Sequence, residues 1–478
     1  MLFNSFSFAL FFPIVFVLYW FVFNKKYTHQ NYLLLFASYF FYANWDWRFM
    51  LLLLFSTILD YVSGLKIEAA NSKTKMKIWL WLSIGINLGF LGFFKYFNFF
   101  IGSFTELLKD LGIQVNVSTL QIILPVGISF YTFHGLSYVL DIYNGKIKAE
   151  KNFVDYSVFV SFFPLLVAGP IERATHLLPQ IQKERKFDYS KSIDGLRQIL
   201  WGLFKKIVIA DNCAEYANTI FNNSADQSGS NLVLGALFFT IQIYCDFSGY
   251  SDIALGTARL LGIELLKNFS FPYFSRDIAE FWRRWHISLS SWFRDYLYIP
   301  LGGSKGGIWM KIRNTFIIFL VSGFWHGANW TFIFWGFLNA LYFLPLLLTN
   351  NNRNNLEVVA MGKLLPSLKD FFKIAITFGL TVFAWIFFRA ESLTHAFNYI
   401  GGIFSPSLFT LPTVFSLNII FLIIFFFVIE WFGREDRFAL ESFGLKWPPF
   451  LRIGFYYFII FLIIMFMGNE QEFIYFQF

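Results

Sequence analysis

Two histidines in apolar or aromatic surroundings are the residues of this chain best suited to chemistry. His326 lies in the run 314–348, which contains no Lys, Arg, Asp or Glu. Ionisable side chains inside a membrane are rare and usually mark a functional site, because a charge at the centre of a spanning helix costs roughly 2.5–3.5 kcal/mol. His286 lies forty residues earlier, in the aromatic segment 281–295. Since no metal-type spacing surrounds either histidine, the sequence predicts proton transfer and no metal site.

The depth of His326 can be estimated from the chain itself. It lies thirteen residues after Arg313, which is about 20 Å along a helix at 1.5 Å per residue and therefore close to the middle of a bilayer. On one continuous helix, Ser322, Asn329 and Trp330 would be its i−4, i+3 and i+4 neighbours and could orient the ring. The alternative is a structural histidine whose imidazole bonds a backbone carbonyl. We favour the functional interpretation because Trp and Gly residues surround this histidine.

The segment 264–313 is too charged to lie in lipid, although it is rich in aromatic residues. Drawn as a helix, its polar side chains share one face and its large apolar side chains share the other. The polar face holds Arg283, His286, Ser290 and Arg294, and the opposite face holds Trp282, Trp285, Leu289, Trp292 and Tyr296. We predict an amphipathic helix that lies at the membrane interface or dips into the protein from the cytoplasm. The Gly-rich stretch 298–307 matches no nucleotide-binding fingerprint and predicts a flexible re-entrant loop.

The composition places these residues in a membrane protein. The 478-residue chain is 57% hydrophobic and 14% charged, compared with about 25% charged in an average soluble domain. Apolar runs that could cross about 30 Å of hydrocarbon recur from end to end, so we predict an all-α polytopic protein with roughly ten to twelve transmembrane helices in one membrane-embedded domain over 1–478. The predicted spans are 6–23, 31–65 (as one or two pieces), 78–100, 122–140, 153–167, 232–261, 314–348, 371–388, 415–431 and 453–467.

Basic residues near the two ends of the chain predict its orientation. Lys25 and Lys26 follow the first apolar run and no basic residue precedes it, so this run is not a cleavable signal peptide. The positive-inside rule then places the N-terminus outside the cytoplasm. Four basic residues mark a cytoplasmic loop before the last span: Arg434, Arg437, Lys446 and Arg452. The C-terminus is therefore also predicted to be extracytoplasmic.

The net charge of +8 is concentrated in two segments, 171–206 and 264–313, each of which holds eight Lys or Arg against four acids. Either these segments are ordinary cytoplasmic loops, or they form a basic vestibule that attracts an anionic donor such as the phosphates of coenzyme A. Nucleic acid is not an expected partner of so apolar a chain. Cys213 and Cys245 are predicted to be buried thiols without a disulfide.

Three motifs enclose the two histidines: FWRRWHISLS (281–290), DYLYIPLGG (295–303) and GFWHGA (323–328). They resemble motifs of the membrane-bound O-acyltransferase family, in the bacterial branch that acts on alginate, teichoic acid and peptidoglycan. Most of the motifs lie in a core at 122–345. Similar blocks extend over nearly the whole chain: PVGISFYTF (125–133), FFPLLVAGPI (162–171), GLFKK (202–206), YCDFSGYSDIA (244–254) and FIYFQF (473–478).

The resemblance implies helices around a central tunnel, with His326 as the catalytic residue and His286 as a second residue linked to activity. It also implies an acyl thioester donor from the cytoplasm, here acetyl-CoA, used as a substrate with no bound cofactor. The expected product is an O-acetylated extracytoplasmic polysaccharide, such as alginate or a cell-wall glycan. The expected location is the bacterial cytoplasmic (inner) membrane, together with a separate esterase-like extracytoplasmic partner that passes the acyl group on.

The residue types suit this chemistry. A hydroxyl needs a base to attack a thioester, and a neutral imidazole can supply general-base help worth typically 10²–10⁴-fold. We assign that role to His326, and to His286 the polarisation of the carbonyl or the positioning of the donor. The candidate substrate-binding residues are Arg283 and Arg284 (for the donor phosphates), Ser290, Trp325, Asn329 and Asp246. Asp246 and Asp252 lie in an otherwise apolar span and are expected to pair with these arginines or to shape the tunnel.

Two other functions fit some of these observations. A proton-coupled transporter or a polysaccharide export channel could use the histidines as a proton relay, but we find no internal repeat of the kind many transporters have. A lipid-acceptor acyltransferase of the same family would differ only in its acceptor. Transfer from acetyl-CoA separates enzyme from transporter, and the identity of the acetylated product separates polymer from lipid.

Overall fold

The computed structural model describes residues 1–113, 120, 122–167, 169–468 and 471–474, and all regular secondary structure in these residues is helical. This confirms the predicted all-α class for the described chain. Within the described residues, five helices are long and apolar enough to cross a membrane, among them α3 (Trp47–Glu68), α12 (Gly229–Leu260) and α17 (Leu368–Arg389). Three shorter apolar helices lie at 6–22, 417–432 and 449–465. The predicted count of ten to twelve spans stays a prediction.

Two predicted spans in the first 192 residues are interrupted. The run 153–167 is not one span, because α7 (Phe153–Ser161) ends before α8 (Phe163–Leu166) begins. Pro164 lies in the first turn of α8, where its missing N–H is tolerated and a longer α7 would not tolerate it. The run 31–65 divides into α2 (Tyr27–Ala43) and α3, the second of two options that the sequence allowed. Asp46 separates them and accepts the amide of Arg48 as the N-cap of α3.

The described chain forms two compact units, residues 1–192 with 258–266, and residues 193–257 with 267–478. The first unit contains α1 (Phe6–Val17) to α9 (Ala174–Ile181), with α4 at Lys73–Leu91 and α6 at Ile128–Tyr143. Its buried polar centre is Asp60 of α3, which accepts hydrogen bonds from Ser83 (2.7 Å) and Asn87 (2.8 Å) of α4. Gly135 of α6 faces the same carboxylate, and a Cβ there would collide with it. Satisfied polar groups of this kind fix the relative positions of three otherwise apolar helices.

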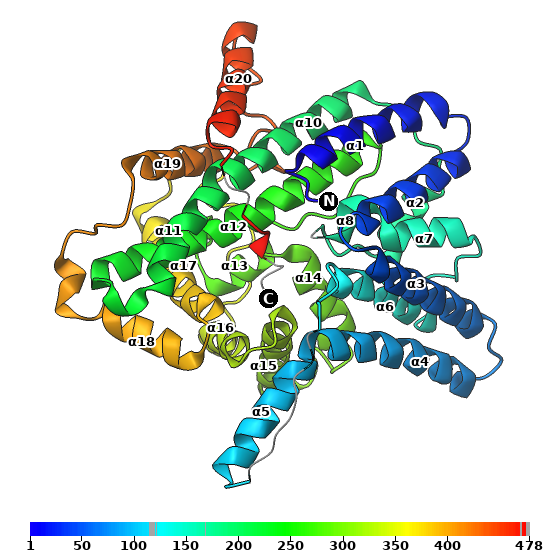
Figure 1. The fold of residues 1–478 in the computed structure, drawn as a ribbon, viewed down its shortest axis with the longest axis horizontal. Helices are drawn as coiled ribbons and strands as arrows, with labels where there is room; N and C mark the ends of the chain where they lie inside the picture. Colours follow the sequence, from blue (N-terminus) through cyan, green and yellow to red (C-terminus); the bar gives the residue numbers. More distant parts are fainter. Residues whose placement is uncertain (114–119, 121, 168, 469–470, 475–478) are drawn as a thin grey trace. The chain divides into compact units, whose positions relative to one another are not determined.

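The second unit is built on α12, most of which is buried. α10 (Tyr189–Leu203) lies against it, as Figure 1 shows. Two glycine pairs allow the close approach: a Cβ on Gly202 would lie 2.6 Å from the carbonyl oxygen of Gly249, and one on Gly256 would lie 2.5 Å from that of Gly195. Small residues at such crossings let helix backbones pack closely inside a membrane.

The second unit contains further helices, most of which Figure 1 labels. They are η3 (Phe204–Ala210), α11 (Asp211–Asn222), α13 (Ile278–Arg284), α14 (Ile287–Phe293), α15 (Gly307–His326), α16 (Trp330–Leu348), α17, α18 (Leu393–Ile403), α19 (Leu417–Phe432) and α20 (Pro449–Met465). Both candidate catalytic histidines belong to this unit.

Candidate active site

His326 is the last residue of α15, at the turn between two tightly packed helices. The predicted span 314–348 is therefore wrong as a single helix: α15 ends at His326 and α16 begins at Trp330. Asn329 caps α16 by accepting the amide of Thr331 at 3.0 Å, so it is not an i+3 helical neighbour of His326. Its side-chain amide donates to the carbonyl of Glu391 at 2.8 Å. Asn329 thus holds the turn that presents His326.

Glycines bring α15 and α16 together at this turn. A Cβ on Gly323 of α15 would collide with the carbonyl oxygen of Phe332, and one on Gly336 of α16 would collide with that of Phe319. The backbones can approach so closely only because neither glycine has a side chain. His326 is consequently fixed to a rigid helical hairpin.

Three aromatic rings enclose the His326 imidazole, which is 5% exposed. The ring centroid of Trp325 lies 4.9 Å away, that of Trp335 in α16 5.2 Å away and that of Phe388 in α17 5.2 Å away. All three rings lie edge-on to the imidazole, the geometry that aromatic pairs prefer. A group this deeply buried is kept from bulk water.

His286 lies at a break between two short helices, so the predicted continuous amphipathic helix over 281–295 is wrong. α13 ends at Arg284, Trp285 is extended (φ −99°, ψ 127°), and His286 has left-handed backbone angles (φ 43°, ψ 54°) as the N-cap of α14. Left-handed angles in a residue other than glycine cost of order 1–3 kcal/mol and cluster at functional sites. The four residues predicted to share one helical face are therefore divided between two helices and the η6 turn (Arg294–Tyr298).

Residues 268–270 form hydrogen bonds with backbone groups that have no helical partner at this break. The amide of Ser270 donates to the carbonyl of Arg284 at 3.0 Å, and the amide of Ile287 donates to the carbonyl of Asn268 at 2.8 Å. The hydroxyl of Ser288 also donates to the Asn268 side chain, at 2.5 Å. These bonds stabilise the break, since buried backbone groups without partners would be costly.

The His286 ring is surrounded by aromatic side chains from several parts of the unit. Its centroid lies 4.7 Å from that of Phe247 in α12, 6.5 Å from that of Phe269 and 6.1 Å from that of Trp325. The residue is 1% exposed. Burial lowers the pKa of His286 to about 3, because a low-dielectric site disfavours the charged imidazolium. His286 is therefore a neutral imidazole near pH 7.

Trp325 connects the two histidines, because its ring contacts both imidazoles. One aromatic cluster thus holds two imidazoles that approach from different helices. Neutral imidazole carries one N–H donor and one acceptor nitrogen. The pair can therefore take a proton at one position and donate a hydrogen bond at the other.

Arg283 and Arg284, the predicted phosphate ligands, are engaged with the protein's own groups. The Arg283 guanidinium donates to the carbonyls of Asn352 and Asn355, each at 2.8 Å. Arg284 pairs with Glu280 at 2.9 Å and donates to the carbonyl of Ser270 at 3.2 Å. Because Arg283 is exposed and a guanidinium has five N–H donors, these bonds leave it able to contact a phosphate, and the role of both arginines stays a prediction.

The expectation that Asp246 and Asp252 pair with these arginines is wrong. Asp246 of α12 pairs with Lys206 at 2.8 Å and accepts the amide of Ile474 at 2.7 Å. Asp252 pairs with Lys205 at 2.6 Å. The lysines of the GLFKK motif belong to η3, which follows α10 directly. Gly249 of α12 allows η3 to approach, because a Cβ there would lie 3.1 Å from the amide nitrogen of Lys206. Ser290, on α14, donates to the carbonyl of Trp285 at 3.4 Å, and its role toward substrate stays a prediction.

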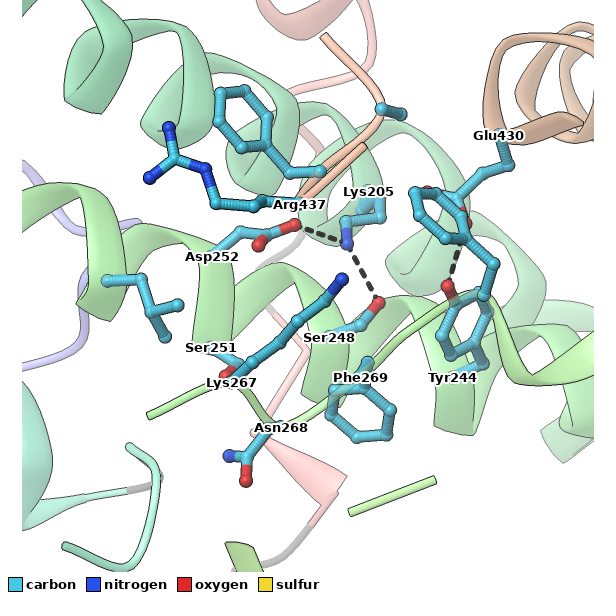
Figure 2. Close-up of a pocket in the computed structure, with 14 residues that line it drawn as sticks. Lys205, Tyr244, Ser248, Ser251, Asp252, Lys267, Asn268, Phe269, Glu430 and Arg437 are labelled. Atoms are coloured by element: carbon cyan, nitrogen blue, oxygen red, sulfur yellow. Dashed lines mark hydrogen bonds and ion pairs between the residues drawn. The ribbon is translucent and has the colours of Figure 1, made fainter. Parts of the chain in front are cut away.

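A polar pocket lies beside the His286 segment (Figure 2). Its wall includes Lys205, Asp252, Lys267, Glu430 and Arg437. The sequence reasoning did not select Lys205, Lys267 or Glu430. One signal was present, since a Glu in the strongly apolar run 415–431 is the kind of intramembrane charge that marks a site. The described residues contain no cluster of three His, Cys, Asp or Glu that could hold a metal ion.

Comparisons with known proteins identify the family of this chain. The model of MBOAT, the membrane-bound O-acyltransferase family, matches residues 146–388, which include both histidines. "Probable alginate O-acetylase AlgI" of Pseudomonas aeruginosa is 39% identical over 447 residues, covering 93% of this chain and 82% of that protein. "Peptidoglycan O-acetyltransferase" of Helicobacter pylori is 37% identical over 396 residues, covering 77% and 73%.

A third relative transfers a different acyl group. "Teichoic acid D-alanyltransferase" of Bacillus subtilis is 30% identical over 286 residues, covering 56% of this chain and 70% of that protein. The family model, the identity over most of the chain and the apolar helices lead to one conclusion. The chain belongs to the membrane-bound O-acyltransferase family and is a membrane-embedded O-acyltransferase.

Proposed function

We propose that this protein transfers an acetyl group from cytoplasmic acetyl-CoA toward an extracytoplasmic polysaccharide, with His326 as general base and His286 as a hydrogen-bond donor. The observation that carries the proposal is the contact of both buried imidazoles with Trp325. Two buried imidazoles in one site could provide both functions that the attack of a hydroxyl on a thioester requires.

In the proposed reaction, the acceptor hydroxyl attacks the thioester carbonyl while His326 takes its proton. The N–H of neutral His286 donates to the carbonyl oxygen as negative charge develops there. The new ester C–O bond forms, the C–S bond breaks, and the thiolate of coenzyme A takes the proton from His326. Acetyl-CoA is a substrate in this scheme and no resident cofactor takes part.

The names of two relatives support an acetyl group and a glycan acceptor. The alginate and peptidoglycan enzymes are both named for O-acetylation, so acetyl transfer to alginate or to a cell-wall glycan is the proposed activity here. The D-alanyltransferase is a reason to test other short acyl thioesters as well. Trp325 lies against both imidazoles and is the proposed wall of the acyl site.

The proposed location is the bacterial inner membrane, with both termini outside the cytoplasm. The basic loops support this orientation, since cytoplasmic loops carry an excess of Lys and Arg. A thioester from the cytoplasm and a polysaccharide beyond the membrane can then meet within the protein without either one crossing. We also propose a separate esterase-like extracytoplasmic partner that receives the acyl group and passes it on.

Sided membrane vesicles test this proposal. Radiolabelled acetyl-CoA would be supplied to inside-out and to right-side-out vesicles that contain the protein, its partner and the glycan. Label should reach partner or glycan only when the donor has access to the cytoplasmic face. Labelling from the opposite face would contradict the proposed topology, and no labelling with any short acyl thioester would contradict the proposed activity.

A further inference from the structure

The pocket beside the His286 segment is lined by three cationic and two acidic side chains. We call it the lysine pocket, and its charged wall residues are Lys205, Asp252, Lys267, Glu430 and Arg437. Figure 2 shows the Lys267 amine pointing into this pocket, on the side of Lys205 and Ser248. These charged side chains differ in the ion pairs and hydrogen bonds that they form with the rest of the protein.

Most of these charges have partners. Lys205 pairs with Asp252 at 2.6 Å and donates to Ser248 at 3.0 Å. Glu430 accepts from the Trp201 indole at 3.0 Å and from the Tyr244 hydroxyl at 2.7 Å. Arg437, at the rim, pairs with Asp194 at 3.0 Å and with Glu441 at 2.5 Å. These contacts account for both carboxylates that line the pocket.

Lys267 is different, because its hydrogen-bond acceptors are neutral oxygens. The ammonium donates to the hydroxyl of Ser270 at 3.2 Å and, over a long 3.5 Å, to the carbonyl of Asp436. Its nitrogen also lies 5.5 Å from the centroid of the Phe271 ring. Among the residues that the structure describes, no carboxylate comes within ion-pair distance of this amine.

The charge on Lys267 persists in spite of its burial. Burial lowers the pKa of Lys267 to about 8, although the carboxylates of Asp252 and Glu430 oppose this shift. The amine therefore keeps its proton near pH 7. A half-buried cation with weak partners, facing a cavity, favours an anionic ligand.

The residues that follow Lys267 in the sequence join the lysine pocket to the segment that carries His286. Asn268 and Phe269 follow Lys267 directly and also line the pocket. The carbonyl and side chain of Asn268 hold Ile287 and Ser288, at 2.8 and 2.5 Å, beside the break that presents His286. The ring of Phe269 lies 6.5 Å from that of His286. An anion at Lys267 would therefore be bound one side chain away from the segment that displays a reacting imidazole.

We infer that Lys267 binds a phosphate group of the acyl-thioester donor in the lysine pocket. The inference rests on the proposed function, which supplies a thioester whose long arm carries phosphate at its far end. The position of the pocket also agrees with a donor from the cytoplasm, because Arg437 in its wall belongs to a predicted cytoplasmic loop. The phosphate has two sources with the same chemistry, coenzyme A itself or a phosphopantetheine arm attached to a carrier protein.

A comparison of donors with and without phosphate tests the inference. Initial rates would be measured in vesicles for wild type, Lys267→Met, Lys267→Arg and the matched control Lys446→Met, an exposed lysine outside the pocket. The donors would be acetyl-CoA, acetyl-phosphopantetheine, acetyl-pantetheine and an acetylated carrier protein. Binding of free coenzyme A to each purified protein would be measured by calorimetry, which requires no turnover.

The inference predicts that Lys267→Met raises the KM for phosphate-bearing donors about tenfold or more, with little change in kcat, because one charge-assisted hydrogen bond is lost. Acetyl-pantetheine should be used equally well by Lys267→Met and wild type, Lys267→Arg should recover most of the loss, and Lys446→Met should resemble wild type. The donor with the largest dependence on Lys267 identifies the source of the phosphate.

Two outcomes would overturn the inference: an equal loss with acetyl-pantetheine, or no loss with any donor. If Arg283→Gln raised the KM for phosphate-bearing donors and Lys267→Met did not, the phosphate site would be assigned to the arginines. If wild type binds coenzyme A through Lys267 but transfers no acetyl, the proposed function fails and the lysine pocket stands. If wild type transfers acetyl and Lys267→Met has the same KM as wild type for every donor, the inference about the lysine pocket is wrong and the proposed function is unaffected.

Discussion

The buried ion pair between Asp246 and Lys206 gives a quantitative test of how the second unit is held together. The two side chains are 3% and 2% exposed and 2.8 Å apart. Lys206 also pairs with Asp211 at 2.7 Å and donates to the carbonyl of Gln471 at 3.1 Å. The second oxygen of Asp246 accepts the amide of Ile474 at 2.7 Å. One carboxylate therefore joins α12 and η3 to the end of the described chain.

The expected cost of Asp246→Leu follows from these contacts. The change removes two charge-assisted hydrogen bonds, each worth roughly 1.5–3 kcal/mol, and it leaves Lys206 with one carboxylate that is itself 14% exposed. Breaking a buried pair from one side typically costs about 3–5 kcal/mol, and we expect a value in that range. Lys206→Met should cost a similar amount, because it leaves Asp246 buried without its cation.

The double variant separates this account from simple loss of packing. Replacing both members of a buried pair with apolar residues is often nearly neutral, so Lys206→Met with Asp246→Leu should cost at least about 2 kcal/mol less than the sum of the single changes. Unfolding in mixed detergent and SDS micelles, followed by tryptophan fluorescence, would measure the free energies. Additive single effects would refute the reasoning, since the two side chains would then not be coupled.

Three further predictions follow from packing and burial. Gly202→Ala should lower the thermal stability clearly, because its Cβ would lie 2.6 Å from the carbonyl oxygen of Gly249, whereas Gly454→Ala, with open space around it, should not. The pKa of His286 is about 3 in the folded protein and about 6.5 unfolded. The unfolded chain therefore binds more protons between these values, and stability should fall by on the order of a few kcal/mol as the pH drops from about 6.5 toward 3. His286→Phe should flatten that dependence in pH-resolved melting curves, and an unchanged slope would contradict it. Cys213 is fully buried and burial raises its pKa, so a maleimide should label it only after unfolding; rapid labelling of the native protein would show that the thiol is accessible.

The sequence identified the residue types of the site better than their geometry. His326 and His286 could be selected because imidazoles are unusual in such apolar and aromatic surroundings. The turn after His326 was missed because its flanks are continuously apolar, although Gly327 and Asn329 provide a possible helix stop and N-cap. The break at His286 could not be predicted, since hydrogen bonds from Asn268 and Ser270 stabilise it and the helical periodicity continues across it.

Ion pairs between residues far apart in the sequence could not be predicted from sequence patterns either. Asp246 and Asp252 could be recognised as unusual in an apolar span, but their partners were not evident. The assignment to Arg283 and Arg284 was wrong because glycines bring η3 close to α12. Lys267 was not selected because one lysine in a basic segment has no distinguishing pattern, and only the cavity that it faces sets it apart.

The most direct test of the central claim is transfer of labelled acetyl from acetyl-CoA in membranes that contain wild type or His326→Ala, with partner and glycan present. His29→Ala, at an exposed histidine, is the matched control, and correct insertion of each variant would be verified. We predict that wild type and the control label partner or glycan, and that His326→Ala loses about 10²–10⁴-fold in rate, as expected when a general base is removed. Equal labelling by correctly inserted His326→Ala would contradict the account, because the buried imidazole would then have no part in the chemistry.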